Sequence, residues 1–397
     1  MRKVHQNSEG LLNNLKSHNS SDLATYLCKK TWPLAPSTST SKSKLIRIAD
    51  LYCGCGGLTL GAMQASFALS RQFEIALAID ISSKATGVYQ TNFDKFSKRV
   101  LSDDLTKFAT DSTFAKLNSR GKTLTKLVGK IDVLLAGPPC QGNSNLNNNS
   151  RGNDPRNDLY LAPSLFANEL RANIVIIENV PGVVHGNSEV VQRSILKLQK
   201  DGYFCHELVV NLTTLGLPQS RKRHLLVASR IHSESQLKLR LNLMPKEKQV
   251  VCLSNFISDI EDEPSLFPSV FSMPGRPTSE NLKRINYLFD HGLFDLPNSL
   301  RPPCHKNKPH SYVSMYGRLR GDAPSQTITS GFGSMGQGRF VHPTRRRTIT
   351  PHEAARIQGF PDYFSFDEIK SITELRQMIG NAVAPKLSFE IVTRLLN

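Results

Sequence analysis

Short apolar segments recur along the chain from residue 45, separated by Gly, Pro and Asn turn signals or by stretches with a helical pattern. The four clearest are residues 45–52, 73–80, 130–137 and 173–180. Such near-continuous apolar strands are typical of a parallel sheet covered on both faces. Candidate helices at 58–69 and 159–172 lie between them. The alternation predicts a doubly wound, mostly parallel α/β domain whose ligand edge lies at the carboxyl ends of the strands.

The pattern changes in the second half of the chain. Residues 206–229 are expected to form a closing strand pair joined by a polar, basic turn. From 236 to 340 the chain is rich in Pro, Gly, Asn and basic residues, so we expect a second, smaller and irregular domain there. The α/β pattern then resumes, and 386–397 has the apolar spacing of an amphipathic helix packed on the sheet. The expected catalytic domain therefore comprises 45–235 and 341–397.

Residues 1–44 are polar and end in the run STSTSKSK, which predicts an extension and a linker without a core of its own. This segment has seven Lys or Arg residues against two acidic ones. If it touches DNA it should do so through phosphates, and the alternative is a solubilising leader. A helix around Leu23, Tyr26, Leu27 and Trp32 that docks on the catalytic domain is the less favoured interpretation.

The whole chain of 397 residues carries 50 Lys and Arg against 33 Asp and Glu, a formal net charge of +17. Such an excess of basic over acidic residues favours a polyanionic partner such as nucleic acid, although a solvated basic face would give the same excess. The seven cysteines are scattered and odd in number, which argues for reduced thiols rather than a disulfide framework. The sequence has neither a signal-peptide core nor an apolar run of membrane-spanning length, so we expect an intracellular protein.

A glycine-rich turn, DLYCGCGG at 50–57, follows the first predicted strand. Glycines let backbone N–H groups approach a ligand closely, and the helix that follows adds a favourable dipole. The next strand ends in Asp80, where nucleotide-binding folds place an acid for ribose hydroxyls. Together these features favour an adenosine-containing cofactor over a purely structural turn. Cys53 and Cys55 have no second pair at zinc-site spacing, so we interpret them as packing residues and predict no metal site.

Two further strands end in residues suited to chemistry. Cys140 lies in GPPCQG, directly after the strand at 130–137, and the paired prolines should fix its position. Glu178 ends the next strand, at the same expected edge of the sheet. A thiolate beside a carboxyl group that donates a proton is a coherent pair of nucleophile and acid. The long, Asn-rich segment after Cys140 suggests a lid.

Six motifs in a fixed order carry a family resemblance. They are DLYCGCGG, PPCQG, ENVPG, QSRKR, RTITPHEAARIQGFP and GNAVAP. In this order and spacing they resemble the DNA (cytosine-5)-methyltransferases of the prokaryotic restriction-modification or orphan type. The resemblance covers 45–229 and 348–397, and 236–340 stands where this family carries its target-recognition domain. The first motif departs from the family in having Cys53 and Cys55 where small or apolar residues are usual.

The resemblance implies a mechanism as well as a fold. Cys140 would attack C6 of cytosine while Glu178 contacts N3 and the exocyclic amine, after which C5 takes the methyl group of S-adenosylmethionine. The target base must be flipped out of double-stranded DNA for this chemistry, and the loop from 141 to 157 is expected to close over it. Arg221 and Arg223 are the implied partners of the cytosine O2 and of neighbouring phosphates, with two solvated arginines as the alternative.

The resemblance also implies a cofactor pocket for S-adenosylmethionine. The implied residues are Tyr52, Gly54, Gly56, Gly57, Asp80, Asp104, Pro139, Leu159, Asn381 and Val383. In this assignment Asp80 accepts from the ribose hydroxyls and Asp104 from the adenine amine, with the adjacent Asp103 as a rival for the second role. Asp50 and Asn381 have simple helix capping as an alternative role.

Other interpretations explain fewer of these features. A nicotinamide dehydrogenase would account for the glycine-rich turn and Asp80, but not for Cys140 and Glu178. A transfer RNA methyltransferase of the same fold is disfavoured because the insert lacks the Cys-Phe-Thr signature of those relatives. A catalytically inactive DNA-binding homologue is disfavoured because both catalytic residues are present. We expect a cytoplasmic, nucleoid-associated monomer. No local pattern encodes which DNA sequence it recognises or whether a restriction endonuclease is paired with it.

Overall fold

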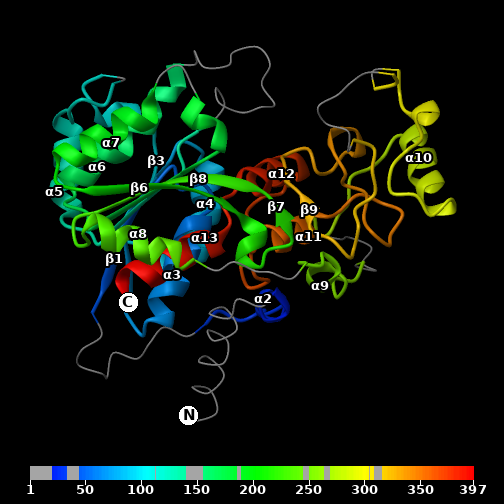
Figure 1. Ribbon diagram of the computed structural model, residues 1–397, viewed down its shortest axis with the longest axis horizontal. Helices are drawn as coiled ribbons and strands as arrows, with labels where there is room; N and C mark the ends of the chain where they lie inside the picture. The colour runs from blue at the N-terminus through cyan, green and yellow to red at the C-terminus, as the bar shows by residue number, and fades with distance from the viewer. Residues whose placement is uncertain are drawn as a thin grey trace, which may run out of the picture.

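A seven-stranded sheet forms the centre of the larger part of the molecule in the computed structural model (Figure 1). The structure describes residues 20–33, 44–111, 113–139, 155–185, 189–244, 250–262, 269–303, 305–307 and 315–397. The strands of the sheet are β1 (Ile46–Leu51), β2 (Phe73–Asp80), β3 (Val100–Ser102), β4 (Val133–Ala136), β5 (Ile174–Asn179), β6 (Phe204–Asn211) and β8 (Lys222–Ser229). In the order β3-β2-β1-β4-β5-β8-β6, the first five pair in parallel and β8 runs antiparallel to both neighbours. The predicted doubly wound, mostly parallel α/β fold is confirmed.

Two layers of helices cover the sheet. The first layer consists of α3 (Gly57–Ala68), α4 (Ser83–Phe93), α8 (Glu234–Asn242) and α13 (Pro385–Leu396). The second consists of α5 (Ser119–Val128), α6 (Ala162–Glu169) and α7 (Val190–Lys200). In β5, Ile174 and Ile176 belong to the core under the first layer, and Val175 and Ile177 to the core under the second. Because both faces of each strand are buried, the strands appear in the sequence as near-continuous apolar runs.

The predicted C-terminal helix is α13, and it packs on α3 at very short range. A Cβ atom built on Gly61 of α3 would lie 1.9 Å from the carbonyl oxygen of Pro385, so only glycine permits this approach. Ser388 Oγ also donates a hydrogen bond of 2.7 Å to the carbonyl oxygen of Leu58. The end of the chain is therefore packed against the helix that follows the glycine-rich turn.

The closing strand pair predicted at 206–229 forms β6 and β8. Its connection contains β7 (Gln219–Ser220), which pairs in parallel with β9 (Ser325–Gln326) from the second region of the chain. The helix α8 contacts β6 and α13, so it covers the sheet even though the predicted second domain starts at residue 236. The assignment of 236–340 as a target-recognition domain stays a prediction.

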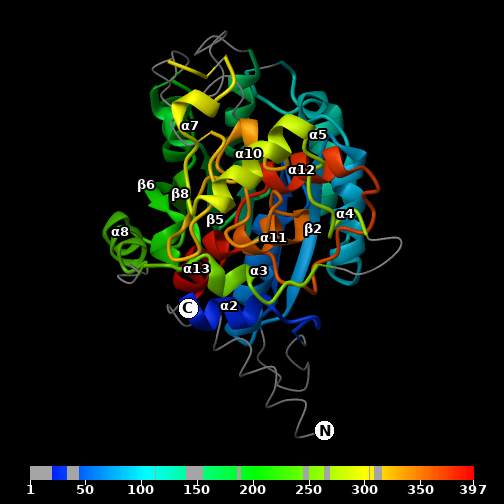
Figure 2. The same ribbon diagram turned by 90° about the vertical axis from the view of Figure 1, so that its right-hand side faces the viewer.

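The second region holds few regular elements, as its composition indicates. Its helices are α9 (Ser254–Ile257) and α10 (Ser279–Asp290). Two later helices, α11 (Pro351–Ile357) and α12 (Ile372–Asn381), lie between α10 and the sheet (Figures 1 and 2). A small separate core holds Ile285, Leu288, Leu296, Tyr316, Met335 and Val341.

Short 3₁₀ helices occur in both regions. They are η1 (Asp94–Phe96), η2 (Leu105–Phe108), η3 (Pro155–Leu161), η4 (Pro181–His185), η5 (Leu212–Leu215), η6 (Asn298–Leu300) and η7 (Met335–Gln337). Within the described ranges, no helix has the length and hydropathy to cross a membrane.

The N-terminal segment departs from the sequence-based expectation. Residues 20–27 form α2 (Ser20–Leu27), which buries Leu23, Tyr26 and Leu27. The hydroxyl of Tyr26 lies 2.5 Å from that of Tyr363, and the ring of Trp32 packs at 4.6 Å, between centroids, on the same tyrosine. The preference for an undocked extension is therefore wrong for residues 20–33. Residues 1–19 and 34–43 lie outside the described part of the chain.

Candidate active site

The turn between β1 and α3 requires its glycines. Gly54 and Gly56 have φ angles of 53° and 98°, and Tyr52 adopts 58°. A Cβ atom on Gly56 would lie 2.4 Å from an aromatic ring of α4, and one on Gly57 would lie 2.0 Å from the carbonyl oxygen of Val383. The turn is therefore held between α4 and the segment that precedes α13, with its backbone at the ligand edge of the sheet.

Asp80, at the end of β2, is fixed by the same turn. Its Oδ2 accepts a hydrogen bond of 2.9 Å from the backbone N–H of Gly54, and its Oδ1 accepts one of 2.9 Å from that of Ser82. Burial raises the pKa of Asp80, and these two N–H groups oppose the rise. Carboxylate oxygens have further lone pairs, so Asp80 keeps acceptor capacity for the hydroxyl groups of a ligand.

A cavity of about 490 Å³ opens at this edge of the sheet. Its walls come from the glycine-rich turn, the β2–α4 junction, the exit of β4 and the C-terminal half of α12. The predicted cofactor residues that line it are Tyr52, Gly54, Gly57, Asp80, Pro139, Asn381 and Val383. Its volume lies within the range of small-molecule sites, and its walls combine apolar surface with backbone and carboxylate groups. These residues fit a ligand of the size and polarity of S-adenosylmethionine.

Three predicted cofactor residues do not line this cavity. Gly56 faces the aromatic side chains of α4. Leu159 is linked to the site because the hydroxyl of Tyr52 donates a hydrogen bond of 2.9 Å to the carbonyl oxygen of Leu159. Asp104 accepts a hydrogen bond from a backbone N–H of η2, whereas the adjacent Asp103 forms ion pairs with two basic side chains. The role of Asp104 toward adenine stays a prediction, and its rival is engaged by other groups.

Ile81 lines the cavity although the motif analysis did not single it out. It follows Asp80 directly, and the residue is 72% exposed. An exposed apolar side chain beside a row of polar groups suits contact with a flat, apolar part of a ligand. The sequence signal is an isoleucine placed one residue beyond the acid that ends the strand.

Asp50 and the two cysteines of the turn are buried. Thr59 Oγ1 donates a hydrogen bond of 2.7 Å to Asp50, and burial raises the pKa of this carboxyl to about 7. Burial also raises the pKa of Cys53, and it raises that of Cys55 to about 12, so both thiols stay protonated at neutral pH. Within the described ranges, no three His, Cys, Asp or Glu side chains form a group that could hold a metal ion.

The predicted acid, Glu178, lies beside this cavity. It is the last but one residue of β5, and its side chain is 8% exposed. A Cβ atom on Gly137, at the exit of β4, would lie 3.8 Å from Glu178 Oε2. The amide of Asn179 donates a hydrogen bond of 3.1 Å to the carbonyl oxygen of Pro138 and so fastens the same exit. Cys140 and the predicted closing loop up to residue 154 lie outside the described residues.

The two predicted arginines have different partners. Arg223 on β8 forms an ion pair of 2.5 Å, Nε to Oε1, with Glu178. Arg221 is 5% exposed, and its guanidinium donates to the carbonyl oxygens of Ile328 at 2.7 Å and Gly380 at 3.2 Å. Arg223 is thus brought to the candidate acid, whereas Arg221 ties the second region to α12. Their predicted contacts with cytosine and phosphates stay predictions.

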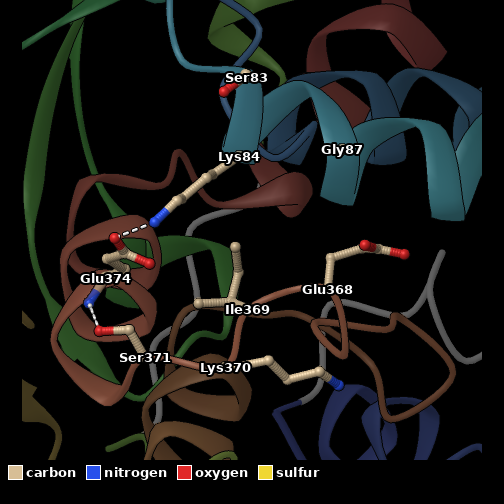
Figure 3. A pocket seen from close by; sticks show the side chains of 8 residues that line it. All are labelled: Ser83, Lys84, Gly87, Glu368, Ile369, Lys370, Ser371 and Glu374. Carbon is tan, nitrogen blue, oxygen red and sulfur yellow. Dashed lines mark hydrogen bonds and ion pairs between the residues drawn. The ribbon is translucent and has the colours of Figure 1, made fainter.

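A shallow groove of about 640 Å³ adjoins the rim of the cavity (Figure 3). Lys84 of α4 and Glu374 of α12 line both, and they form an ion pair that connects the two helices. Their side chains are 57% and 39% exposed, and an exposed pair of this kind contributes about 0–1 kcal/mol. The rim between α4 and α12 is therefore held by a weak, screened contact.

Comparison with known sequences points to one family. Residues 46–397 match the model for C-5 cytosine-specific DNA methylases. The chain is 41% identical over 346 residues to the type II methyltransferase M1.BsuMI of Bacillus subtilis strain 168, a similarity that covers 87% of this chain and 79% of the relative. It is 28% identical over 349 residues to the type II methylase M.HgiDII of Herpetosiphon aurantiacus, with 85% and 91% covered.

Solved structures share the fold at lower identity. A putative DNA modification methyltransferase encoded within a prophage of E. coli gives a TM-score of 0.59 at 22% identity, and the match covers 89% of this chain and 99% of that one. The Dnmt2 methyltransferase of S. pombe gives 0.57 at 16% identity, with 88% and 97% covered. The sheet and both helical layers are therefore an architecture found in other methyltransferases.

Proposed function

The chain belongs to the C-5 cytosine-specific DNA methylases, and from this premise we propose that it methylates a flipped-out cytosine within a specific double-stranded DNA sequence through a covalent adduct of Cys140. S-adenosylmethionine is the proposed methyl donor. The observation that carries the proposal is the meeting of Glu178, the β4 exit that leads into Cys140 and the cavity beside Asp80 at one edge of the sheet.

The proposed chemistry follows from the low nucleophilicity of C5 in cytosine. Addition of the Cys140 thiolate to C6 makes C5 enamine-like, and Glu178 donates the proton to N3 that stabilises the adduct. S-adenosylmethionine, when bound, supplies the electrophilic methyl group. Loss of the C5 proton and elimination of the thiolate then release the product. The pocket requires an extrahelical base because C6 is not accessible in a stacked duplex.

Arg223 holds Glu178 in the structure described here, and this contact bears on the proton transfer. In this contact the Nε of Arg223 lies at Oε1 of Glu178, on the same carboxyl group that must reach N3 and the exocyclic amine. We therefore propose that Arg223 turns to O2 of the cytosine as the base enters, so that Glu178 is free to bind N3 and the exocyclic amine. A phosphate contact by Arg221 would require it to leave two backbone carbonyls.

Residues 236–340 are the proposed determinant of the DNA sequence. They break the strand-helix alternation, and Lys, Arg, Gly and His are frequent in them. The proposal includes a monomeric enzyme acting on chromosomal DNA in the cytoplasm, paired with a restriction endonuclease as the type II names of its relatives indicate. Grafting 236–340 into a relative of known specificity should transfer the methylated site, and an active chimera that keeps the host site contradicts the assignment.

Transfer of tritium from labelled S-adenosylmethionine tests the reaction. Duplex DNA should accept label, whereas RNA and a reaction without acceptor should not. Cys140→Ala should abolish transfer and also the covalent trapping of the enzyme on 5-fluorocytosine DNA, while DNA binding persists. Turnover in that variant at the rate of the wild type contradicts the adduct. Bisulfite sequencing of DNA from an expressing host that lacks other cytosine methylation then identifies the site.

A further inference from the structure

A second cavity, here named the Arg376 pocket, shares a wall with the proposed cofactor cavity at Gln377. It has a volume of about 310 Å³ and lies between α12 and the glycine-rich loop that follows β9. Its lining residues are Ser330, Gly331, Gly333, Ser334, Gln337, Thr373, Arg376 and Gln377. None of these described residues is acidic, and the pocket takes no part in the mechanism derived above.

Arg376 is held in this pocket by close packing. A Cβ atom on Gly333 would lie 2.2 Å from the guanidinium carbon of Arg376, so the side chain rests on a position that only glycine leaves open. A Cβ atom on Gly380 would lie 2.3 Å from the backbone nitrogen of Ser330, which shows that the loop lies directly on α12. The guanidinium therefore rests against Gly333 of a loop that is itself packed on α12.

Among the described residues, no acidic side chain forms an ion pair with Arg376. Within the described part of the chain, its Nε is buried and has no hydrogen-bond partner. Burial lowers the pKa of Arg376, the direction expected for a cation that is desolvated without compensation. Arg376 is partly buried, so an anion in the pocket would offset the desolvation of its charge and supply a partner for Nε.

The rest of the pocket suits the same kind of ligand. Its lining includes Ser330, Ser334, Thr373 and Gln337, residue types that can donate hydrogen bonds to an anion. Thr373 belongs to the first turn of α12, where the helix dipole favours negative charge. The planar fork of an arginine matches the geometry of phosphate oxygens. A phosphate group therefore fits the arginine and the hydroxyl-bearing residues that line the pocket.

We propose that the Arg376 pocket binds a backbone phosphate of the substrate DNA, an inference that rests on the proposed function as a DNA methylase. The pocket adjoins the proposed cofactor cavity, and its loop belongs to the segment proposed to contact DNA. The contact positions the duplex without reading its sequence, because phosphates carry no base identity. The group that occupies the pocket is thus a phosphodiester of the DNA backbone.

Arg376→Gln tests the proposal in the full-length chain on a duplex that the wild type methylates. One charge-assisted contact is worth about 10-fold to 100-fold in affinity. The slope of log K against log salt should also fall by about 0.9, the change for one phosphate. Arg71→Gln is the control, because this substitution removes the same charge from a residue that precedes β2, at the sheet edge opposite the cavity. The control should change neither quantity to this extent.

A scan of neutral methylphosphonate linkages along the duplex locates the phosphate. One linkage should weaken binding of the wild type by the same factor as Arg376→Gln and should have no further effect on that variant. Gly333→Ala, which displaces the guanidinium but keeps its charge, should show the same loss at the same linkage. Binding of S-adenosylhomocysteine without DNA should match the wild type in all variants and reports correct folding.

Equal salt slopes for the wild type and Arg376→Gln, or linkages that weaken both proteins alike, would overturn the proposal. Such a result would leave the methylase reaction intact, because the wild type is measured on DNA that it methylates. A wild type that methylates no DNA would instead contradict the proposed function on which the inference rests.

Discussion

Substitution of Arg356 by Met tests the ion-pair cluster that joins the N-terminal segment to the second half of the chain. The guanidinium of Arg356 donates to Asp362 at 2.5 and 2.6 Å and to Asp259 twice at 3.1 Å. It also contacts Sγ of Cys28 at 3.2 Å and the carbonyl oxygen of Phe256 at 3.0 Å. One side chain of α11 thus connects the segments that follow α2 and α9.

The loss on substitution comes mainly from Asp362. Its side chain is 8% exposed, whereas that of Asp259 is 48% exposed and can be hydrated. Removing one partner of a buried ion pair costs about 3–5 kcal/mol. Folding free energies of single domains are about 5–15 kcal/mol, so Arg356→Met should remove a large fraction of the stability.

The dependence on pH identifies the source of that loss. Burial raises the pKa of Asp362, but the bonds from Arg356 and His352 outweigh this effect and lower the pKa to about 2. A carboxyl with a lowered pKa stabilises the folded state fully above its ordinary pKa of 3.8, and that stabilisation is lost as the pH falls toward 2. The difference between the wild type and Arg356→Met should therefore shrink as the pH falls from about 4 toward 2.

Urea unfolding measures both quantities. Circular dichroism reports the whole fold, and fluorescence of Trp32, the only tryptophan of the chain, reports the docked N-terminal segment. Arg320→Met is the control, because the pair of Arg320 with Asp322 is exposed and should contribute little to the stability. A loss below about 1 kcal/mol for Arg356→Met, or the same loss at pH 7 and pH 3, would refute the reasoning.

Three further substitutions test the remaining contacts. Glu178→Gln should slow single-turnover methyl transfer by about 10² to 10⁴, the usual effect of losing a general acid, and an unchanged rate would make Glu178 structural only. Gly61→Ala brings a Cβ atom against the carbonyl oxygen of Pro385 and should lower the unfolding free energy by about 1–3 kcal/mol. Gly87→Ala on α4, where a Cβ atom meets nothing within 4 Å, is its matched control and should not destabilise the fold. Leu27→Ala should cost about 2–5 kcal/mol in the same urea titration because this side chain is 1% exposed, and a neutral effect would contradict the docking of α2.

The fold was accessible from the sequence where burial on both faces left a clear pattern. The segments 73–80 and 173–180 contain the uninterrupted apolar runs 75–79 and 174–177, and β2 and β5 have nearly the predicted bounds. The docking of α2 was missed because its buried side chains, such as Tyr26, stand in a polar segment and find their partners in residues far along the chain. Tertiary packing of this kind leaves no local periodicity.

The candidate site likewise has features that the sequence predicts and features that depend on tertiary packing. Asp80, Glu178 and the glycine-rich turn stand at strand ends, so the order of strands alone predicts that they meet. The partners of Arg221 could not be predicted, because they are backbone carbonyls of Ile328 and Gly380 and depend on how the second region sits on α12. The unpaired guanidinium of Arg376 likewise becomes visible only in three dimensions.

The contact between Gly57 and the carbonyl oxygen of Val383 has a consequence for biosynthesis. One wall of the proposed cofactor cavity is translated near the start of the chain and the opposite wall near its end. Because chains fold from the N-terminus as they emerge from the ribosome, the parallel strands are made before α12 and α13 are available to complete the cavity. A chain that stops before α12 therefore has all the strands of the sheet but lacks one wall of the proposed cofactor cavity.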